Sequence, residues 1–321
     1  LWIKNRTNTP NHQLMDSVRG FNLRIESNNN SAELDAGEAG ATYQNVTSFD
    51  SDGFSVKNGD AVNESGKTFV AWQWKAGTSV SGNTGGSGTA KSYTGSVNTD
   101  AGFSIITYTG NGTAGHTIPH HLSAVPNIVL TKGRSAALNW FFFDSMSNYL
   151  KRLKLNTTDA QADTDGLNDT APTSSVFTVS GGGEGNTNGA TYVAYLFAEK
   201  QGYSKFGSYT GNGNADGTFV YTGFSPAFVM IKNVGQTASW NIKDNRRNNA
   251  STSFNINPRN ATLLPNDSAA DQDANALDFL SNGFKNRSNG GDVNASGTQF
   301  IYMAFAEQPF VTSTGVPATA R

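Results

Sequence analysis

The chain of 321 residues contains no cysteine, and only 15% of its residues are charged. Without cysteine, disulfides and thiolate metal sites are excluded, and assembly in a reducing cytoplasm becomes plausible on chemical grounds. The net charge of −2 is not gathered into a basic or acidic block. Because a nucleic-acid backbone requires a clustered positive field, we expect no nucleic-acid partner. No apolar run is long enough for a membrane helix, so we expect no membrane insertion, and no signal-peptide pattern is present.

Polarity comes instead from Asn, Ser, Thr and 35 glycines. Glycine and asparagine tolerate the positive φ angles of tight turns, so this composition favours many short strands joined by turns. Hydrophobic residues make up 36% and aromatic residues 11% of the chain, which is enough for several small cores.

Three phrases recur in the same order along the chain, with the spacing from lysine to aspartate kept. They read LWIKNR (1–6), IVLTKGR (128–134) and FVMIKNV (228–234); NHQLMDSVR (11–19), NWFFFDSM (139–146) and SWNIKDNRR (239–247); VNESGKTFVAWQWK (62–75), NTNGATYVAYLFAEK (186–200) and VNASGTQFIYMAFAEQ (293–308). Repetition of a whole segment predicts a tandem array of related modules, and it favours multivalent display or assembly over a single catalytic site.

Within the phrases, apolar residues alternate with a period of two, as in Val193, Tyr195 and Phe197. Alternation of β-branched and aromatic residues predicts strands, and Asp52-Gly53 and Asn282-Gly283 predict tight hairpin turns. We therefore expect an all-β fold of about three tandem β-sandwich-like modules, the first truncated at its N-terminus. Residues 144–155 fit either a helical turn or an irregular strand, and residues 268–280 form the best candidate for a short helix.

The predicted organisation is module 1 (residues 1–77), a flexible Gly/Ser/Thr-rich connector (78–102), module 2 (103–200), module 3 (201–310) and a polar tail (311–321). Modules 2 and 3 open with strand-like phrases, FSIITYTGNG and KFGSYTGNG, that module 1 lacks. We therefore expect that the native polypeptide continues upstream of Leu1.

Two residue types are constant in the repeats and predict a structural role. They are the aspartates Asp16, Asp144 and Asp244, and the lysines Lys4, Lys132 and Lys232. An aspartate at the end of a strand often accepts hydrogen bonds from turn amides.

Trp140 and Trp240 occupy equivalent positions, where module 1 has His12. A tryptophan face can stack on the apolar face of a sugar ring, which makes both residues candidates for glycan binding. Aligned tryptophans in a sandwich are, however, more often core residues.

Metal and acid–base chemistry have weaker signals. Asp159, Asp163, Asp165 and Asp169 surround Gly166 and could hold Ca²⁺, but the terminal glutamate of an EF-hand is missing. His116, His120 and His121 flank Pro119, which disfavours a helical zinc site. We expect no metal and no cofactor.

A glycosidase would require two nearby carboxylates, for which Asp144, Asp244, Glu199 and Glu307 are the residues to consider.

Several phrases together resemble repeats in structural proteins of marine bacteriophages such as cyanophages and pelagiphages. These repeats often lie beside laminin-G or concanavalin-A-like domains. The phrases are SYTGNG (208–213), WIKNR (2–6), FDSDGF (49–54), YVAYLFAE (192–199) and the ending PFVTSTGVPATAR (309–321). The resemblance implies a virion protein, such as a tail fibre or another surface appendage, and it carries no catalytic residues.

The expected function is that of a non-enzymatic protein of the virion surface, assembled in the host cytoplasm and acting outside the cell. Its β-module loops would recognise a host glycan or surface protein, and it would contact other virion proteins and form a homo-oligomer. The alternative is a purely architectural role, as a capsid decoration or tail-associated protein. A polysaccharide depolymerase is a third and weaker possibility.

Overall fold

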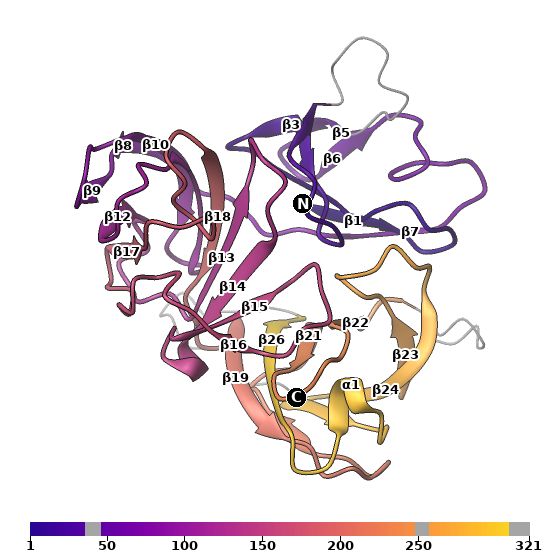
Figure 1. Cartoon of the computed structure of the whole chain (residues 1–321). Helices are drawn as coiled ribbons and strands as arrows, with labels where there is room; N and C mark the ends of the chain where they lie inside the picture. The colour runs from indigo at the N-terminus through magenta and orange to yellow at the C-terminus, as the bar shows by residue number, and fades with distance from the viewer. Residues whose placement is uncertain (36–45, 248–256, 308–321) are drawn as a thin grey trace. The chain divides into compact units, whose positions relative to one another are not determined.

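The computed structural model describes residues 1–35, 46–247 and 257–307, and the chain divides into two compact units (Figure 1). Unit 1 comprises Leu1–Asn156 and Ala162–Ala198, and unit 2 comprises Thr157–Gln161 and Glu199–Arg321. Both are built almost entirely from antiparallel strands, which confirms the all-β, sandwich-like fold. Module 1 and most of module 2 lie together in unit 1, whereas residues 157–161 and 199–200 of module 2 belong to unit 2.

The N-terminal part of unit 1 contains a five-stranded sheet of order β4-β3-β2-β1-β7 and a separate hairpin, β5-β6. The strands are β1 (Trp2–Asn5), β2 (Gln13–Asp16), β3 (Gly20–Ile25), β4 (Leu34–Asp35), β5 (Val46–Phe49), β6 (Phe54–Val56) and β7 (Phe69–Trp72). Ile3, Met15 and Val46 are central residues of the core that joins the sheet to the hairpin. The predicted turn at Asp52-Gly53 is confirmed, since it connects β5 to β6.

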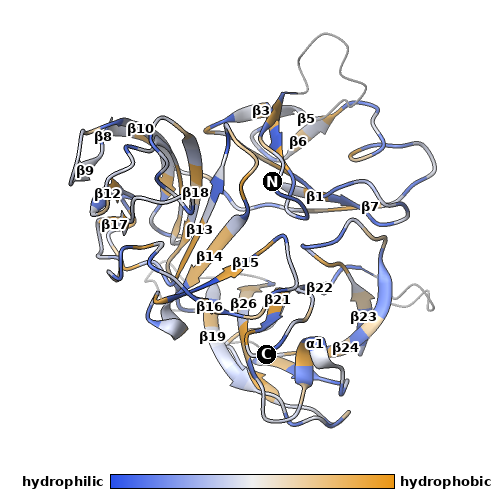
Figure 2. Ribbon diagram, in the orientation of Figure 1, coloured by the Kyte–Doolittle hydropathy of each residue, from blue (hydrophilic) through white to orange (hydrophobic). Residues whose placement is uncertain are grey.

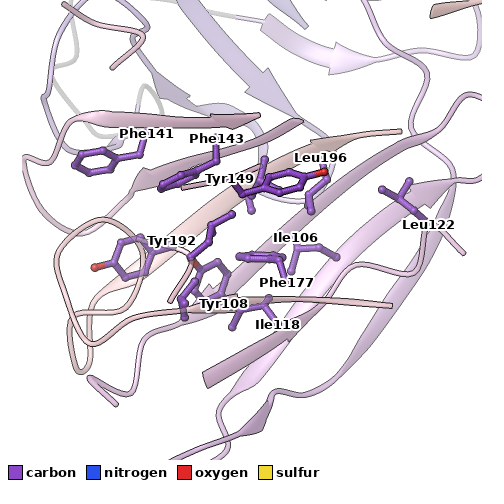
Figure 3. Packing of buried hydrophobic residues seen from close by; sticks show 14 of the residues in the cluster. Ile106, Tyr108, Ile118, Leu122, Phe141, Phe143, Tyr149, Phe177, Tyr192 and Leu196 are labelled. Carbon is purple, nitrogen blue, oxygen red and sulfur yellow. The ribbon is translucent and has the colours of Figure 1, made fainter. Parts of the chain in front are cut away.

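The rest of unit 1 is an eight-stranded sheet of order β16-β15-β14-β13-β18-β11-β10-β8 and a three-stranded sheet of order β17-β12-β9. The elements are β8 (Thr78–Asn83), β9 (Gly85–Gly86), β10 (Ser92–Asn98), β11 (Phe103–Thr109), β12 (His116–Pro119), β13 (Ile128–Gly133), β14 (Trp140–Asp144), the 3₁₀ helix η1 (Ser145–Ser147), β15 (Lys151–Lys154), β16 (Ala162–Asp163), β17 (Val176–Val179) and β18 (Thr191–Phe197). One apolar core includes residues of both sheets, among them Ile106, Tyr108, Phe143, Phe177 and Tyr192 (Figure 3).

The expectation of a flexible connector at residues 78–102 is wrong. Strand β8 pairs with β10 along its whole length, and β10 pairs with β11. The small residues of this segment serve close packing: a Cβ on Gly95 would lie 2.4 Å from the Ile105 carbonyl oxygen, and one on Gly82 would lie 3.0 Å from the Tyr93 hydroxyl. Glycine is required here by the approach of neighbouring groups, which sequence composition does not distinguish from flexibility.

Unit 2 is formed by two four-stranded sheets, of orders β19-β26-β21-β22 and β20-β25-β24-β23. Its elements are β19 (Ser204–Thr210), β20 (Phe219–Tyr221), β21 (Pro226–Asn233), β22 (Asn241–Asp244), β23 (Arg259–Thr262), β24 (Gln272–Leu280), β25 (Gly283–Asn286), α1 (Gly291–Asn294) and β26 (Gln299–Ala306). Val229 and Phe300 of one sheet share a core with Leu277 and Phe284 of the other, so the two sheets form a β-sandwich. Figure 2 shows hydrophobic and hydrophilic residues on the strands of this unit.

The expected helix at residues 268–280 is also wrong, because Gln272–Leu280 forms strand β24. The predicted turn at Asn282-Gly283 is confirmed, since it connects β24 to β25 in an antiparallel hairpin. Pairing with β25 decides the conformation of a segment whose own propensity is weak. Residues 144–155 contain both of the alternatives expected there, a turn of 3₁₀ helix and strand β15. The predicted tail at residues 311–321 lies outside the described residues.

Candidate functional site

Lys132 lies near the end of β13 and is 1% exposed. Its ammonium group donates hydrogen bonds to the carbonyl oxygens of Asn30, Ser31 and Gly133, at 3.3, 2.8 and 2.9 Å. These acceptors match the three N–H bonds of the group. Burial lowers the pKa of Lys132 to about 8, against the opposing charge of Glu33. The lysine therefore fastens residues 30–31 of module 1 to a strand of module 2.

Lys232 has the same environment in unit 2. Its ammonium group donates to the carbonyl oxygens of Thr158, Asn233 and Ala238, at 3.3, 2.9 and 2.9 Å. Burial lowers its pKa to about 8, and the charge of Asp292 opposes that shift. Thr158 follows strand β15 as Asn30 follows strand β3, so the two lysines hold corresponding segments of the chain.

Lys4 is fully buried as well, and it donates to the carbonyl oxygens of Asn5 and Asn8 at 2.7 and 3.2 Å. The three repeated lysines are thus interior residues that bind backbone oxygen. A role as exposed binding groups is excluded by their burial, and the structural role expected from the sequence fits these contacts.

Three asparagines with a related role were missed in the sequence. The side-chain oxygens of Asn28, Asn156 and Asn266 accept hydrogen bonds from the backbone N–H groups of the residues at the repeated His/Trp/Trp position, at 3.0, 2.9 and 2.8 Å. Asn28 and Asn156 stand equally far from Lys4 and Lys132, and this equal spacing is the signal that could have identified them. In module 3 an insertion before the asparagine hides the signal.

Asp16 and Arg19 form the centre of a buried polar network in unit 1. The Asp16 carboxylate accepts from the backbone N–H of Arg19 at 2.9 Å and from its guanidinium Nε at 2.6 Å. The Tyr195 hydroxyl of β18 donates to the same carboxylate at 2.7 Å. Burial alone would raise the pKa of Asp16, but Arg19 and Tyr195 outweigh it and hold that pKa below its ordinary value.

All five N–H bonds of the Arg19 guanidinium group have acceptors. They are Asp16, Tyr195, Glu33 and the carbonyl oxygens of Leu14 and Leu23. The network joins the turn of module 1 to the sheet of module 2. Its contribution is therefore to the packing of unit 1.

Asp244 and Arg247 repeat this arrangement within unit 2. The Asp244 carboxylate accepts from the backbone N–H of Arg247 at 2.8 Å and from its Nε at 2.6 Å, and Arg247 also pairs with Asp271. Burial again opposes ionisation, but the charge of Arg247 keeps the pKa of Asp244 low. The expected role of the aspartates in binding turn amides is confirmed.

Asp144 differs from the other two aspartates, because Ser147 stands where they have arginine. It caps η1 by accepting the backbone N–H of Ser147 at 2.9 Å. Burial raises the pKa of Asp144 to about 6, with the Ser147 amide pulling in the opposite direction.

The two aligned tryptophans do not present their rings to solvent. Trp140 is 0% and Trp240 is 1% exposed. The indole N–H of Trp140 donates to the carbonyl oxygen of Glu26 at 2.8 Å, and its ring stacks with that of Tyr195. Stacking of either indole on a sugar is excluded by this burial, and the core alternative holds.

The possible metal ligands have other partners or lie apart. Asp163 pairs with Lys151 at 2.7 Å, and the His120 Nε2 lies 3.1 Å from the Thr173 carbonyl oxygen. In the described ranges there is no group of three or more His, Asp or Glu side chains that could hold a metal ion. The loop with Asp159, Asp165 and Asp169 therefore offers no assembled calcium site in those ranges.

The glutamates considered for hydrolysis lie in ion pairs. Glu199 accepts from Lys205 at 2.7 Å, and Glu307 lies 3.5 Å from Arg246. A general acid for glycoside cleavage would require a raised pKa. Burial raises the pKa of Asp144, but this side chain caps η1 and is buried.

Two aromatic side chains face solvent from β20, the edge strand of one sheet of unit 2. Phe219 is 44% and Tyr221 is 64% exposed, whereas Val220 between them is buried in the core. Since side chains alternate across a strand, Phe219 and Tyr221 lie on the same outer face. They form the aromatic pair of β20.

A cavity of about 310 Å³ opens in module 1. It is lined by Thr9, Pro10, Asn11, Gln13, Arg24, Glu26, Leu34, Asp60 and Ala61. Glu26 is 6% exposed, and its carboxylate accepts from the side-chain amides of Asn11 and Asn29 at 2.8 and 2.5 Å. Gln13 is 2% exposed, and its Oε1 has no hydrogen-bond partner among the described residues. No sequence motif indicates the cavity or the buried polar groups that line it.

A family model described as Domain of unknown function (DUF7483) matches residues 1–309. No curated protein and no solved structure matches the chain. Among the residues that the structure describes, no helix has the length and apolar character needed to cross a membrane.

Proposed function

Since the chain belongs to the DUF7483 family, whose name assigns no activity, we propose a function from the chain's own surface and sequence. The protein is a non-enzymatic component of a bacteriophage virion surface, part of a tail fibre or a similar appendage. It recognises glycans of the host surface through its β-modules. The resemblance of its repeated phrases to those of marine phage structural proteins supports the virion location.

The observation that carries glycan recognition is the aromatic pair of β20. Aromatic side chains usually bury their rings, and exposed clusters mark interaction sites. The apolar C–H face of a pyranose stacks on such rings. Two rings at alternate positions of a strand offer such faces side by side on an exposed edge of the sheet.

The composition of the chain supports the same reading. Few residues are charged, whereas Asn, Ser and Thr are abundant, and their amides and hydroxyls can hydrogen-bond sugar hydroxyls. A weak site gains strength when several copies act together on one surface, so repetition of the protein on a virion would compensate for a small contact area.

The test is a glycan array and a whole-cell binding assay with the chain and with Tyr221→Ala and Phe219→Ala. We expect either substitution to weaken binding about ten-fold, since a stacked ring contributes on the order of 1–2 kcal/mol. Leu150→Ala is the matched control, because Leu150 is 46% exposed but lies in unit 1. Equal binding by all four proteins would remove the aromatic pair from the proposal.

An architectural role is the second candidate. The buried network around Arg19 fastens modules 1 and 2 to each other, as a rigid spacer requires. Antibody–gold labelling of intact virions separates the two functions. Label at fibre tips supports recognition, whereas label spread evenly over the capsid or tail tube supports the architectural role.

A further inference from the structure

The cavity of module 1 contains a buried acceptor whose orientation is fixed. The side-chain Nε2 of Gln13 donates to the Asn11 carbonyl oxygen at 3.0 Å and lies 3.4 Å from Glu26 Oε1. Both of these atoms can only accept, so the amide cannot be reversed. Oε1 is therefore the unpartnered atom, and a buried carbonyl oxygen without a donor is unfavourable.

The corresponding position of module 3 shows how such an amide is normally satisfied. Asn241 also donates from its amide to a nearby carbonyl oxygen, that of Ser239, at 3.0 Å. Its own oxygen accepts from the Asn275 side chain at 2.9 Å. In module 2 the position holds Phe141, which has no polar atom to satisfy. Module 1 has a polar residue at this position with a cavity beside it.

The charges that line the cavity select against an anionic ligand. Glu26 and Asp60 supply two carboxylates, and Arg24 supplies one guanidinium group, which lies 3.9 Å from Glu26. The carboxylate of Glu26 is held by two amides, so it stays in place as an acceptor. The lining therefore offers acceptors for hydroxyl donors, and its net negative charge repels carboxylate and sulfate groups.

The rest of the lining suits the carbon skeleton of a sugar. Pro10, Leu34 and Ala61 add apolar surface to this polar lining, and Leu34 is 39% exposed. A volume of about 310 Å³ is at the lower end of the range for small-molecule sites, which fits a single ring better than a long chain.

We propose that this cavity binds one neutral hexose-type residue, whose hydroxyl group donates a hydrogen bond to Gln13 Oε1. The ligand class is a neutral polyhydroxylated ring, as a free sugar or as the end of a glycan. The site is separate from the aromatic pair of β20. It adds a second sugar contact, within unit 1, to the function proposed above.

The test measures binding of free glucose, galactose and mannose, with glucuronate as the anionic counterpart, by saturation-transfer NMR and titration calorimetry. The protein is the full chain carrying both Phe219→Ala and Tyr221→Ala, so that the aromatic pair does not contribute. We expect at least one neutral sugar to bind and glucuronate to bind more weakly. Gln13→Met keeps the side-chain length but removes the acceptor, and it should weaken binding about ten-fold.

Gln73→Met is the matched control, since Gln73 is exposed and is not a lining residue, and it should leave binding unchanged. If Gln13→Met unfolds the protein, Asp60→Ala replaces it, because Asp60 is exposed at the cavity and should tolerate substitution. Absence of binding by every neutral sugar, or equal binding by the cavity variants, would overturn the proposal. Glycan binding that depends on Tyr221 alone would overturn only the cavity and leave the proposed function standing.

Discussion

Asp16 and Asp144 occupy equivalent turns of modules 1 and 2, but only Asp16 is followed at the third position by an arginine. Both carboxylates accept turn amides, so the turn itself does not depend on the arginine. Their ionisation differs: the pKa of Asp16 is lowered, and burial raises that of Asp144 to about 6. What all three modules share is therefore the capping of a turn, and the arginine network is an addition that modules 1 and 3 have and module 2 lacks.

The largest effect should come from breaking this network. Arg19→Met leaves the Asp16 carboxylate in the interior without its cation and removes one of the two arginines that pair with Glu33. Removal of one partner from a buried ion pair costs about 3–5 kcal/mol, which we expect for unit 1 in urea denaturation. Four of the five tryptophans lie in unit 1, so indole fluorescence reports its unfolding.

Arg247→Met should have a comparable cost in unit 2, since Arg247 pairs with Asp244 and Asp271. If either variant lost less than about 1 kcal/mol in its free energy of unfolding, the arginine network would contribute little to stability. The turns of Asp16 and Asp244 would then not differ in stability from that of Asp144.

The second effect concerns Asp144 and depends on pH. Its folded pKa of about 6 exceeds the ordinary value of 3.8, so the folded state retains a proton that the unfolded state loses. The free energy of unfolding must therefore fall as pH rises from about 4 to 6. Asp144→Asn should remove this loss and be more stable than the parent by about 2 kcal/mol above pH 6, with the difference vanishing below pH 4.

Thermal unfolding of the parent and of Asp144→Asn at a series of pH values tests this difference directly. Asp16→Asn is the opposite control. The stability that ionised Asp16 contributes is present above pH 4 and is lost as pH falls through its lowered pKa, so its substitution should destabilise at neutral pH.

The smallest of the three effects comes from Lys132, whose surroundings resemble those of Lys232. Its folded pKa of about 8 lies below the ordinary 10.5, so stability should rise between pH 8 and 10.5 as the folded state gives up the proton first. Lys132→Met should reduce that rise and leave the part that Lys232 contributes in unit 2. It should also cost about 1–2 kcal/mol at pH 7, because the carbonyl oxygens of Asn30 and Ser31 lose a donor. An unchanged pH profile in this variant would contradict the role assigned to the lysine.

The sequence predicted what depends on local pattern. The alternating residues correctly predicted strands, Asp52-Gly53 and Asn282-Gly283 predicted hairpins, and the repeated aspartates predicted capped turns. Each of these follows from contacts within a few residues. The repeat also pointed to the lysines, although nothing in it showed that their partners would be carbonyl oxygens.

What the sequence could not give depends on partners distant in the chain. Residues 272–277 form a strand because β23, an earlier segment outside the β24–β25 hairpin, pairs with them. Trp140 fits the core because Glu26 supplies an acceptor for its indole N–H. The unpartnered oxygen of Gln13 has no counterpart in any motif, since its environment is set by side chains from four separate segments.

The interior lysines also allow local unfolding of the protein to be followed by chemical labelling. Lys4, Lys132, Lys232 and Lys243 are at most 1% exposed, and the ammonium group of each is engaged with backbone oxygen. An amine-reactive reagent would label surface lysines such as Lys151 at once, but these four only when the surrounding strands separate. The order in which they acquire label, read by peptide mass spectrometry, would report which unit of the protein opens first.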